Sequence, residues 1–297
     1  MANLKEIRTR ISSVQSTRQI TSAMKMVSAA KLRKAQDSII QIRPYANKLQ
    51  EILHNLTDNL DNEVENIYGT EREIKKILFV IITSNKGLCG GFNSNVVKKT
   101  TQLINEDYKY LYSTNNIDLI TIGKKGSDLL KTKGYTILER HDDLLDNLTF
   151  ENVHPLIKQI MDAYVSGSYD AVRIIYNQFK NAAVQTLSDE QFLPISFDTE
   201  NEELDDFEET HFDYILEPTK EYIIQEIIPK SLKIQFYKTL LDSVASEHGA
   251  RMTAMHKATD NATELIKDLQ LEYNKARQAS ITNEILEIVS GAEALKG

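Results

Sequence analysis

The sequence has few of the residues that build disulfide-stapled or membrane-spanning proteins. Its 297 residues include one cysteine and no tryptophan, and aromatic residues make up 7%. A single cysteine excludes a disulfide within the chain and fits a reducing compartment. No apolar run reaches the roughly 20 residues that a helix needs to cross a bilayer. The polar start shows neither a signal-peptide core nor a transit peptide. Any association with a membrane is therefore expected to occur through a partner.

Recognisable catalytic and ligand-binding patterns are also missing. The six histidines show no metal-ligand spacing, and His248 and His256 are eight positions apart, too far for a helical zinc site. No carboxylate pair and no nucleophile–base set stands out. Basic residues are not interleaved with aromatic ones, as nucleic-acid binding would require. We expect no catalytic residue, no metal, no cofactor, no small-molecule substrate and no nucleic-acid partner.

Proline and glycine are nearly absent from the last quarter of the chain, which predicts one long helix. The 68 residues from Lys230 to Gly297 contain no proline, and Gly249 is their sole glycine before residue 291. They would form a rod of about 100 Å, whereas a compact globule of this length would be roughly 50 Å across. A long helix packed on a large core is therefore the weaker alternative. The apolar positions step by three and four, as in a coiled-coil seam: Met255, Ala258, Ala262, Leu265 and Leu269, then Ile281, Ile285, Ile288, Ala292 and Leu295.

Residues 2–60 form a second long-helix candidate, with Pro44 as the one proline. The apolar rhythm continues across Pro44, so we expect a kinked helix rather than a break. Each helix would leave its seam unburied unless the two pair, so we expect an antiparallel coiled coil with a left-handed supercoil. The seam runs through Leu4, Ile7, Ile11 and Val14, and then through Ala35, Ile39, Ile42, Ala46, Leu49, Leu53, Leu56 and Leu60.

Charge is spread unevenly along a chain whose formal net charge is −8. Residues 1–60 carry ten Lys and Arg against four Asp and Glu. Their basic collar, Arg18, Lys25, Lys31, Arg33 and Lys34, is either a solvated helix face or a contact for an acidic partner. The segment Asp198–Glu209 has eight acidic residues in twelve and is expected to be a surface loop.

The middle of the chain predicts an open, mostly parallel α/β sheet. Residues 77–83 are a continuous apolar run, as in a buried parallel strand. Further strands are expected over 117–123, 135–140, 169–179 and 212–216, with helices over 93–104, 127–131 and 150–165. Thr219 is expected to cap a short helix, and Pro229 to open the final one.

The predicted fold class is α/β, with two parts. The N- and C-terminal helices form a long antiparallel two-helix coiled coil, and a central Rossmann-like domain follows from the alternating strands and helices. The predicted domain bounds are 1–60, 70–217 with the acidic loop 198–209, and 218–297 with the long helix from about residue 230.

A glycine-rich loop, Ser84–Asn93, follows the first strand and precedes a helix, where phosphate-binding loops lie. Its pattern from Gly87 is G-x-x-G-G, which matches neither dinucleotide-binding nor P-loop spacing. We therefore interpret it as a tight structural turn, with nucleotide binding as the alternative. Cys89 within it is expected to be a small buried group.

Three segments together resemble the gamma subunit of the rotary, F-type ATP synthase, over essentially the whole chain. They are residues 20–33 (ITSAMKMVSAAKLR), the loop 84–93, and most specifically residues 250–261 (ARMTAMHKATDN) with 271–292. The resemblance implies a central-stalk rotor shaft that couples rotation of the membrane c-ring to ATP synthesis at catalytic beta subunits. The implied partners are the alpha, beta and epsilon subunits and the c-ring. The resemblance also implies that the chain itself holds no catalytic site.

The resemblance also implies positions of contact. Met24 and Lys25 match the region that faces the beta subunits, and Arg251, Arg277 and Gln278 match positions that contact or stabilise the shaft at the catalytic ring. The loop residues Lys86, Gly87, Leu88 and Cys89, together with Tyr214, are candidate contacts of epsilon or the c-ring.

The implied location is peripheral, at the cytoplasmic face of a bacterial inner membrane, with a mitochondrial origin left open. The chain departs from the light-regulated chloroplast version, whose inserted cysteine pair is absent because Cys89 stands alone. Two other classes of function stay open on the sequence. They are a nucleotide-binding α/β enzyme with coiled-coil arms, and a structural coiled-coil tether.

Overall fold

The computed structural model describes residues 4–57, 67–70, 72–195 and 220–294. It divides into two compact units, Met1–Ala29 with Arg251–Gly297, and Ala30–Ala250. Two long helices, α1 (Leu4–Thr57) and α6 (Lys220–Ala294), each contribute to both units. The predicted strand 212–216, the acidic segment 198–209 and the predicted cap Thr219 lie outside the described residues.

Both long helices contain a proline without ending at it. Pro44 lies inside α1, as predicted, and Pro229 lies inside α6. The prediction that Pro229 opens a separate final helix was therefore wrong. An internal proline removes one helix hydrogen bond. Burial of the neighbouring Ile228, which is 3% exposed, and of Leu232 offsets this loss by packing.

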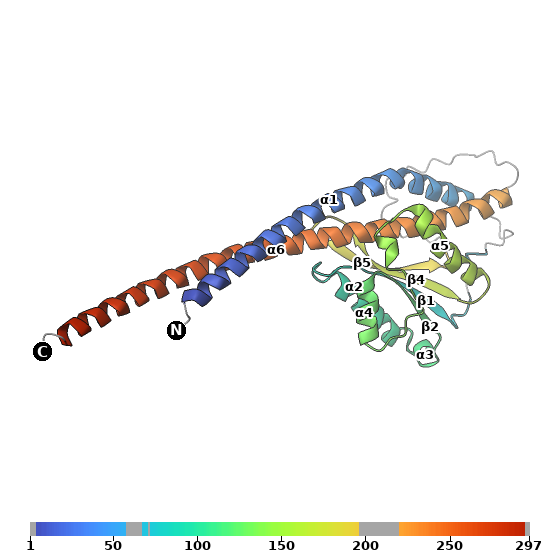
Figure 1. Ribbon diagram of the computed structural model, residues 1–297. Helices are drawn as coiled ribbons and strands as arrows, with labels where there is room; N and C mark the ends of the chain where they lie inside the picture. Colours follow the sequence, from blue (N-terminus) through green and yellow to red (C-terminus); the bar gives the residue numbers. More distant parts are fainter. Residues whose placement is uncertain (1–3, 58–66, 71, 196–219, 295–297) are drawn as a thin grey trace. The chain divides into compact units, whose positions relative to one another are not determined.

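The first unit is an antiparallel helix pair with a narrow buried seam (Figure 1). The Thr259 hydroxyl donates to the Thr21 hydroxyl at 2.8 Å across this seam. On α1 the buried residues are Ile7, Thr21 and Ser28, and on α6 they are Arg251, Met255, Ala262, Ile266 and Leu269. Because Thr21 and Ser28 are small, the two backbones can approach closely where these residues lie.

The seam of α6 differs at one position from the prediction. Leu265 is 40% exposed, whereas Ile266 is 6% exposed. The seam thus steps by four residues after Ala262 and then by three to Leu269. Steps of three and of four both keep a residue on the seam. The apolar pattern alone therefore could not predict which of the adjacent residues Leu265 and Ile266 is buried.

The second unit contains a five-stranded sheet of order β3-β2-β1-β4-β5. The strands are β1 (Ile77–Ile82), β2 (Ile117–Ile122), β3 (Glu139–Arg140), β4 (Ala171–Phe179) and β5 (Gln185–Leu193). β1 to β4 pair in parallel, and β5 pairs antiparallel with β4. The predicted mostly parallel sheet is confirmed. The strand expected over 135–140 is reduced to two residues, and β5 was not predicted because its sequence, QTLSDEQFL, is largely polar at an edge.

Helices cover both faces of this sheet (Figure 1). They are α2 (Phe92–Glu106), α3 (Lys109–Ser113), α4 (Lys124–Thr132) and α5 (Phe150–Val165), with a 3-10 turn at Asp143–Leu145. The chain builds β1, β2 and β3 outward in one direction and then crosses to β4 on the other side of β1. Right-handed crossovers therefore place α5 on the face opposite α2 and α4.

Two apolar cores result from the alternation of side chains along β1. Phe79 and Ile81 face a core shared with α2, α3 and α4. Leu78, Val80 and Ile82 face a core shared with α5 and with residues 228–240 of α6. All six β1 side chains are 0–1% exposed, and each such burial contributes about 1.5–3 kcal/mol. The sheet is thus joined to one of the long helices by apolar packing.

Two glycines after β2 let helix α4 approach the end of β1. Gly123 has a φ of +102°, and a Cβ there would lie 2.2 Å from the carbonyl oxygen of Thr83. A Cβ at Gly126 would lie 2.6 Å from the Thr83 hydroxyl, which accepts a hydrogen bond from the Gly126 N–H at 2.9 Å. This turn therefore tolerates no side chain at either position.

Replacing Gly123 with alanine should lower the free energy of unfolding by about 3 kcal/mol or more, since it adds a backbone clash to a left-handed conformation. The matched control is Gly134→Ala, where φ is +89° but no atom lies within 4 Å of the added Cβ. That control should cost about 1 kcal/mol. Urea denaturation followed by circular dichroism measures both, and equal losses would contradict the role assigned to the contact.

Candidate partner-contact surfaces

The loop after β1 is held in shape by its own polar groups. The Asn93 Oδ1 atom accepts from the Ser84 N–H at 2.9 Å, and the Asn93 Nδ2 group lies 2.8 Å from the Ser84 hydroxyl and 3.3 Å from the Cys89 sulfur. The Ser84 hydroxyl also donates to the Lys86 carbonyl at 2.7 Å. Asn93, Ser84 and Cys89 are all buried. The loop is thus a bonded structural turn, as the spacing of its glycines predicted.

This turn displays some of the predicted contact residues and hides another. Leu88 is 65% exposed and has a φ of 62°, a conformation that is rare for residues other than glycine. Lys86 is also exposed, whereas Cys89 is 2% exposed. The thiol therefore shapes the loop from inside, while Leu88 and Lys86 form its outer surface. Tyr214, the fifth predicted contact, lies outside the described residues.

At the carboxyl edge of the sheet, where open α/β sheets bind ligands, side-chain hydrogen bonds join neighbouring segments. The Asn177 Nδ2 group donates to the Phe92 carbonyl at 3.2 Å, which ties the end of β4 to the start of α2. Asn85 accepts from the Lys124 N–H at 3.0 Å and donates to the Asp142 carbonyl at 2.8 Å. Within the described residues, no group of three His, Cys, Asp or Glu side chains could hold a metal ion.

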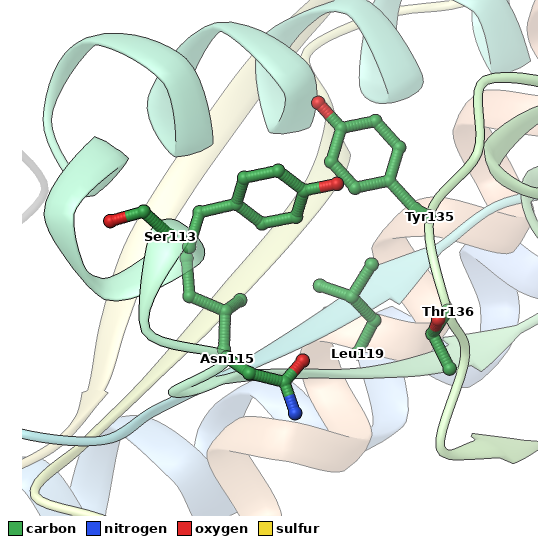
Figure 2. A pocket seen from close by; sticks show the side chains of 7 residues that line it. Ser113, Asn115, Leu119, Tyr135 and Thr136 are labelled. Carbon is green, nitrogen blue, oxygen red and sulfur yellow. The ribbon is translucent and has the colours of Figure 1, made fainter.

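A hollow of about 320 Å³ lies elsewhere, between α3 and the amino end of β2 (Figure 2). Its lining comprises Tyr112, Ser113, Asn115, Ile117, Leu119, Tyr135 and Thr136. The centroids of the Tyr112 and Tyr135 rings lie 5.4 Å apart. The lining has hydroxyl and amide groups but no carboxylate, imidazole or thiol. None of the residues predicted from the sequence to form a site belongs to it.

The α1 surface around residue 24 is apolar and outward-facing. Met24 and Lys25 are half-buried. Nearby Ile20, Met26 and Val27 are 59%, 66% and 57% exposed. These three residues were not among the contacts predicted from the sequence. They could have been recognised in the sequence as large apolar side chains that lie outside the seam of an otherwise polar helix.

The three predicted polar contacts on α6 have different environments. Arg251 is 7% exposed and lies within the helix pair, whereas Arg277 and Gln278 are exposed. Residues 251 and 277 are also about 39 Å apart along the helix. The structure therefore does not bring the three together. Arg251 is buried, and the other two lie at a surface.

The end of α6 has no partner helix among the described residues. Every residue from 281 to 293 is exposed. The bond between Thr21 and Thr259 sets the antiparallel register, so Leu4, where α1 begins, lies opposite about residue 276 of α6. The predicted seam over Ile281–Leu295 is thus not buried in this chain up to residue 293, and Leu295 lies outside the described residues. The exposed large apolar residues are Ile281, Ile285, Leu286, Ile288 and Val289.

These features define a helix pair and an open α/β domain, each with exposed apolar and polar side chains. A family model described as ATP synthase matches residues 3–295. The ATP synthase gamma chain of Flavobacterium johnsoniae is 57% identical and that of Christiangramia forsetii 55% identical, each over 297 residues and all of both chains. The chain therefore belongs to the family of ATP synthase gamma chains.

Solved structures agree with this family. A chain of the Tetrahymena thermophila mitochondrial ATP synthase central stalk and c-ring has 25% identity and a TM-score of 0.57, covering 80% of this chain and 99% of that one. A chain of the Euglena gracilis mitochondrial ATP synthase, in a structure of OSCP, F1 and the c-ring, shares the fold with a TM-score of 0.67. Its identity is 21%, and the match covers 98% of this chain and 94% of that one.

The bonded loop predicts the reactivity of the sole cysteine. Native Cys89 should react slowly with a maleimide, since its thiol is reached through local opening. Asn93→Ala removes bonds to Ser84 and Cys89 and should speed labelling at least about tenfold. Asn95→Ala, on the exposed side of the same helix turn, is the control and should leave the rate unchanged. Equal rates in both variants would show that Asn93 does not hold the loop.

Proposed function

We propose that this chain is the central-stalk rotor shaft of a proton-translocating ATP synthase. It couples rotation of a membrane c-ring to ATP synthesis at catalytic beta subunits. Family membership over the whole length supports this role. The observation that carries it is the end of α6, where thirteen consecutive residues, 281–293, are exposed and no helix in the described part of the chain covers them.

A single exposed helix with a large apolar surface is unfavourable in water, so a partner is expected to cover it. Isoleucine, leucine and valine side chains make contacts without fixed hydrogen bonds. Such contacts can be exchanged at low cost as a shaft turns inside a sleeve of alpha and beta subunits. The paired helices supply the stiffness that a shaft requires, because the residues of their seam are buried, among them Ile7 of α1 and Leu269 of α6.

Four side chains near the shaft surface, three of them polar, provide contacts that depend on its angle. Met24 and Lys25 on α1, and Arg277 and Gln278 on α6, are the proposed contacts with the alpha and beta subunits. Arginine and lysine form strong, directional bonds with carboxylates and carbonyls that can form and release. Each shaft angle then stabilises a different set of beta-subunit conformations. Arg251, which is buried, acts within the shaft.

The loop after β1 is the proposed contact with epsilon or the c-ring. Lys86 and Leu88 supply its exposed charged and apolar groups, and Gly87 and Cys89 its shape. Tyr214 is proposed for the same contact. The proposed role needs no catalytic site in this chain. It is peripheral, held through its partners at the cytoplasmic face of a bacterial inner membrane. No helix in the described part of the chain could cross a bilayer.

Affinity purification of the tagged full chain from its own cells tests this role. Mass spectrometry of the detergent-solubilised complex should recover alpha, beta, epsilon and c subunits together. The isolated chain should not hydrolyse ATP. Substantial hydrolysis without those partners would refute the proposal, as would purification of the chain without alpha and beta subunits.

Charges at the end of α6 should impair function without unfolding the chain. Ile285→Glu with Ile288→Glu should lower ATP synthesis in membrane vesicles on the order of tenfold, since a carboxylate in an apolar sleeve is left unpaired. The unfolding free energy should change by less than about 0.5 kcal/mol, because both sites are exposed. Lys158→Glu, an exposed site of α5, is the control. Wild-type synthesis in the assembled double variant would contradict the sleeve contact.

A further inference from the structure

Gly249 is a buried glycine in the interior of α6. A glycine there destabilises the helix relative to alanine. A Cβ at this position would lie 3.1 Å from the carbonyl oxygen of Ala182 and 3.3 Å from its Cα. By contrast, no atom lies within 4 Å of a Cβ built at Gly291 of the same helix. Glycine at residue 249 thus permits a close backbone-to-backbone approach between α6 and the turn that joins β4 to β5.

That turn is fixed by its own hydrogen bonds. The Asn181 Oδ1 atom accepts from the N–H groups of Ala183 and Val184 at 2.9 and 2.8 Å, and the Asn181 N–H donates to the Val184 carbonyl at 3.1 Å. The Gln185 Nε2 group donates to the Ala182 carbonyl at 3.2 Å. The Ala182 backbone is therefore held from both sides and can yield little to a larger residue in α6.

Gly249 lies beyond the stretch of α6 that packs in the core of the sheet domain. Ile228, Leu232, Phe236 and Leu240 pack in the core under β4 and β5, and the Phe236 ring meets that of Phe192 at 5.4 Å. From Ile228 to Gly249 the helix rises about 32 Å. Gly249 lies one residue before the end of this unit, and α6 continues past it as the same helix.

We propose that the close contact of Gly249 with Ala182, together with the apolar core at residues 228–240, lets the sheet domain transmit torque to the shaft helix. This inference rests on the proposed rotor function and assigns Gly249 as a positioning residue for it. Two contacts far apart on a rigid helix resist its tilting and turning, whereas one apolar patch allows it to pivot. A backbone-to-backbone contact is also stiff, since no rotatable side chain lies between the two elements.

The test compares two substitutions in the complete enzyme, in inverted membrane vesicles. Gly249→Val should push the turn away from the helix, and Gly249→Ala should do so by a few tenths of an ångström. Three quantities are measured: assembled enzyme, ATP hydrolysis, and ATP-driven proton pumping. Pumping per ATP hydrolysed should fall at least about threefold in Gly249→Val, as overpacking displaces the contact. It should fall less in Gly249→Ala, while assembly and hydrolysis stay near wild type.

Gln235→Val is the matched control, since it places the same side chain at an exposed position of the same helix stretch. Unchanged pumping per ATP in assembled Gly249→Val would overturn the inference. A fall of pumping and hydrolysis in proportion to lost assembly would do the same, because a purely structural contact predicts it. If Gly249→Val does not assemble, Asn181→Ala, which loosens the turn from the other side, must lower the ratio instead. An unchanged ratio there also overturns the inference.

The result separates this inference from the rotor proposal on which it rests. Wild-type vesicles that pump protons on ATP addition, with this chain in the complex, support the rotor whatever Gly249→Val does. If the chain is absent from the pumping complex, the proposed function itself fails.

Discussion

The structure depends on the burial of β1 between two layers of helices. Its side chains alternate between a core shared with α2, α3 and α4 and a core shared with α5 and α6. A strand buried on both faces must have helices on both faces, which is the arrangement of an open parallel sheet. Because one of these helices is α6, the same packing that folds the domain also fixes it to a helix of 75 residues.

This attachment explains how a small domain can support a helix that it does not enclose. Residues 228–240 of α6 behave as an ordinary core helix, and Gly249 adds a rigid contact beyond them. Past Ala250 the helix belongs to another unit, where α1 covers one side of it as far as the start of α1 allows. The remaining residues, 281–293, are exposed. Along this one helix, residues lie first in an apolar core, then in a helix pair, and finally at an exposed surface. This order suits a proposed shaft that joins a globular domain to alpha and beta subunits.

Much of this could be predicted from the sequence, because it follows from local patterns. The continuous apolar run before Thr83 predicted β1, the steps of three and four predicted both long helices, and the spacing of the glycines around Cys89 predicted a turn. The strand that was not predicted and the prediction that was wrong also have local causes. β5 is polar because it is an edge strand, and Pro229 was taken as a helix start because the sequence does not reveal that packing around Ile228 compensates for the lost hydrogen bond.

The candidate contacts divide in the same way. Sequence by itself determined the period of the two seams, the stiffness implied by the absence of glycine and proline, and the family to which residues such as Arg251 point. Only the tertiary structure decided that Arg251 is buried and that Ile266 rather than Leu265 enters the seam. The tertiary structure also decided that α6 extends beyond the residue that lies opposite the start of α1. It also decided that Gly249 faces a turn 67 positions earlier. Periodicity is a property of one helix, whereas burial and register depend on where a second element begins and how closely it approaches, and no single segment encodes that.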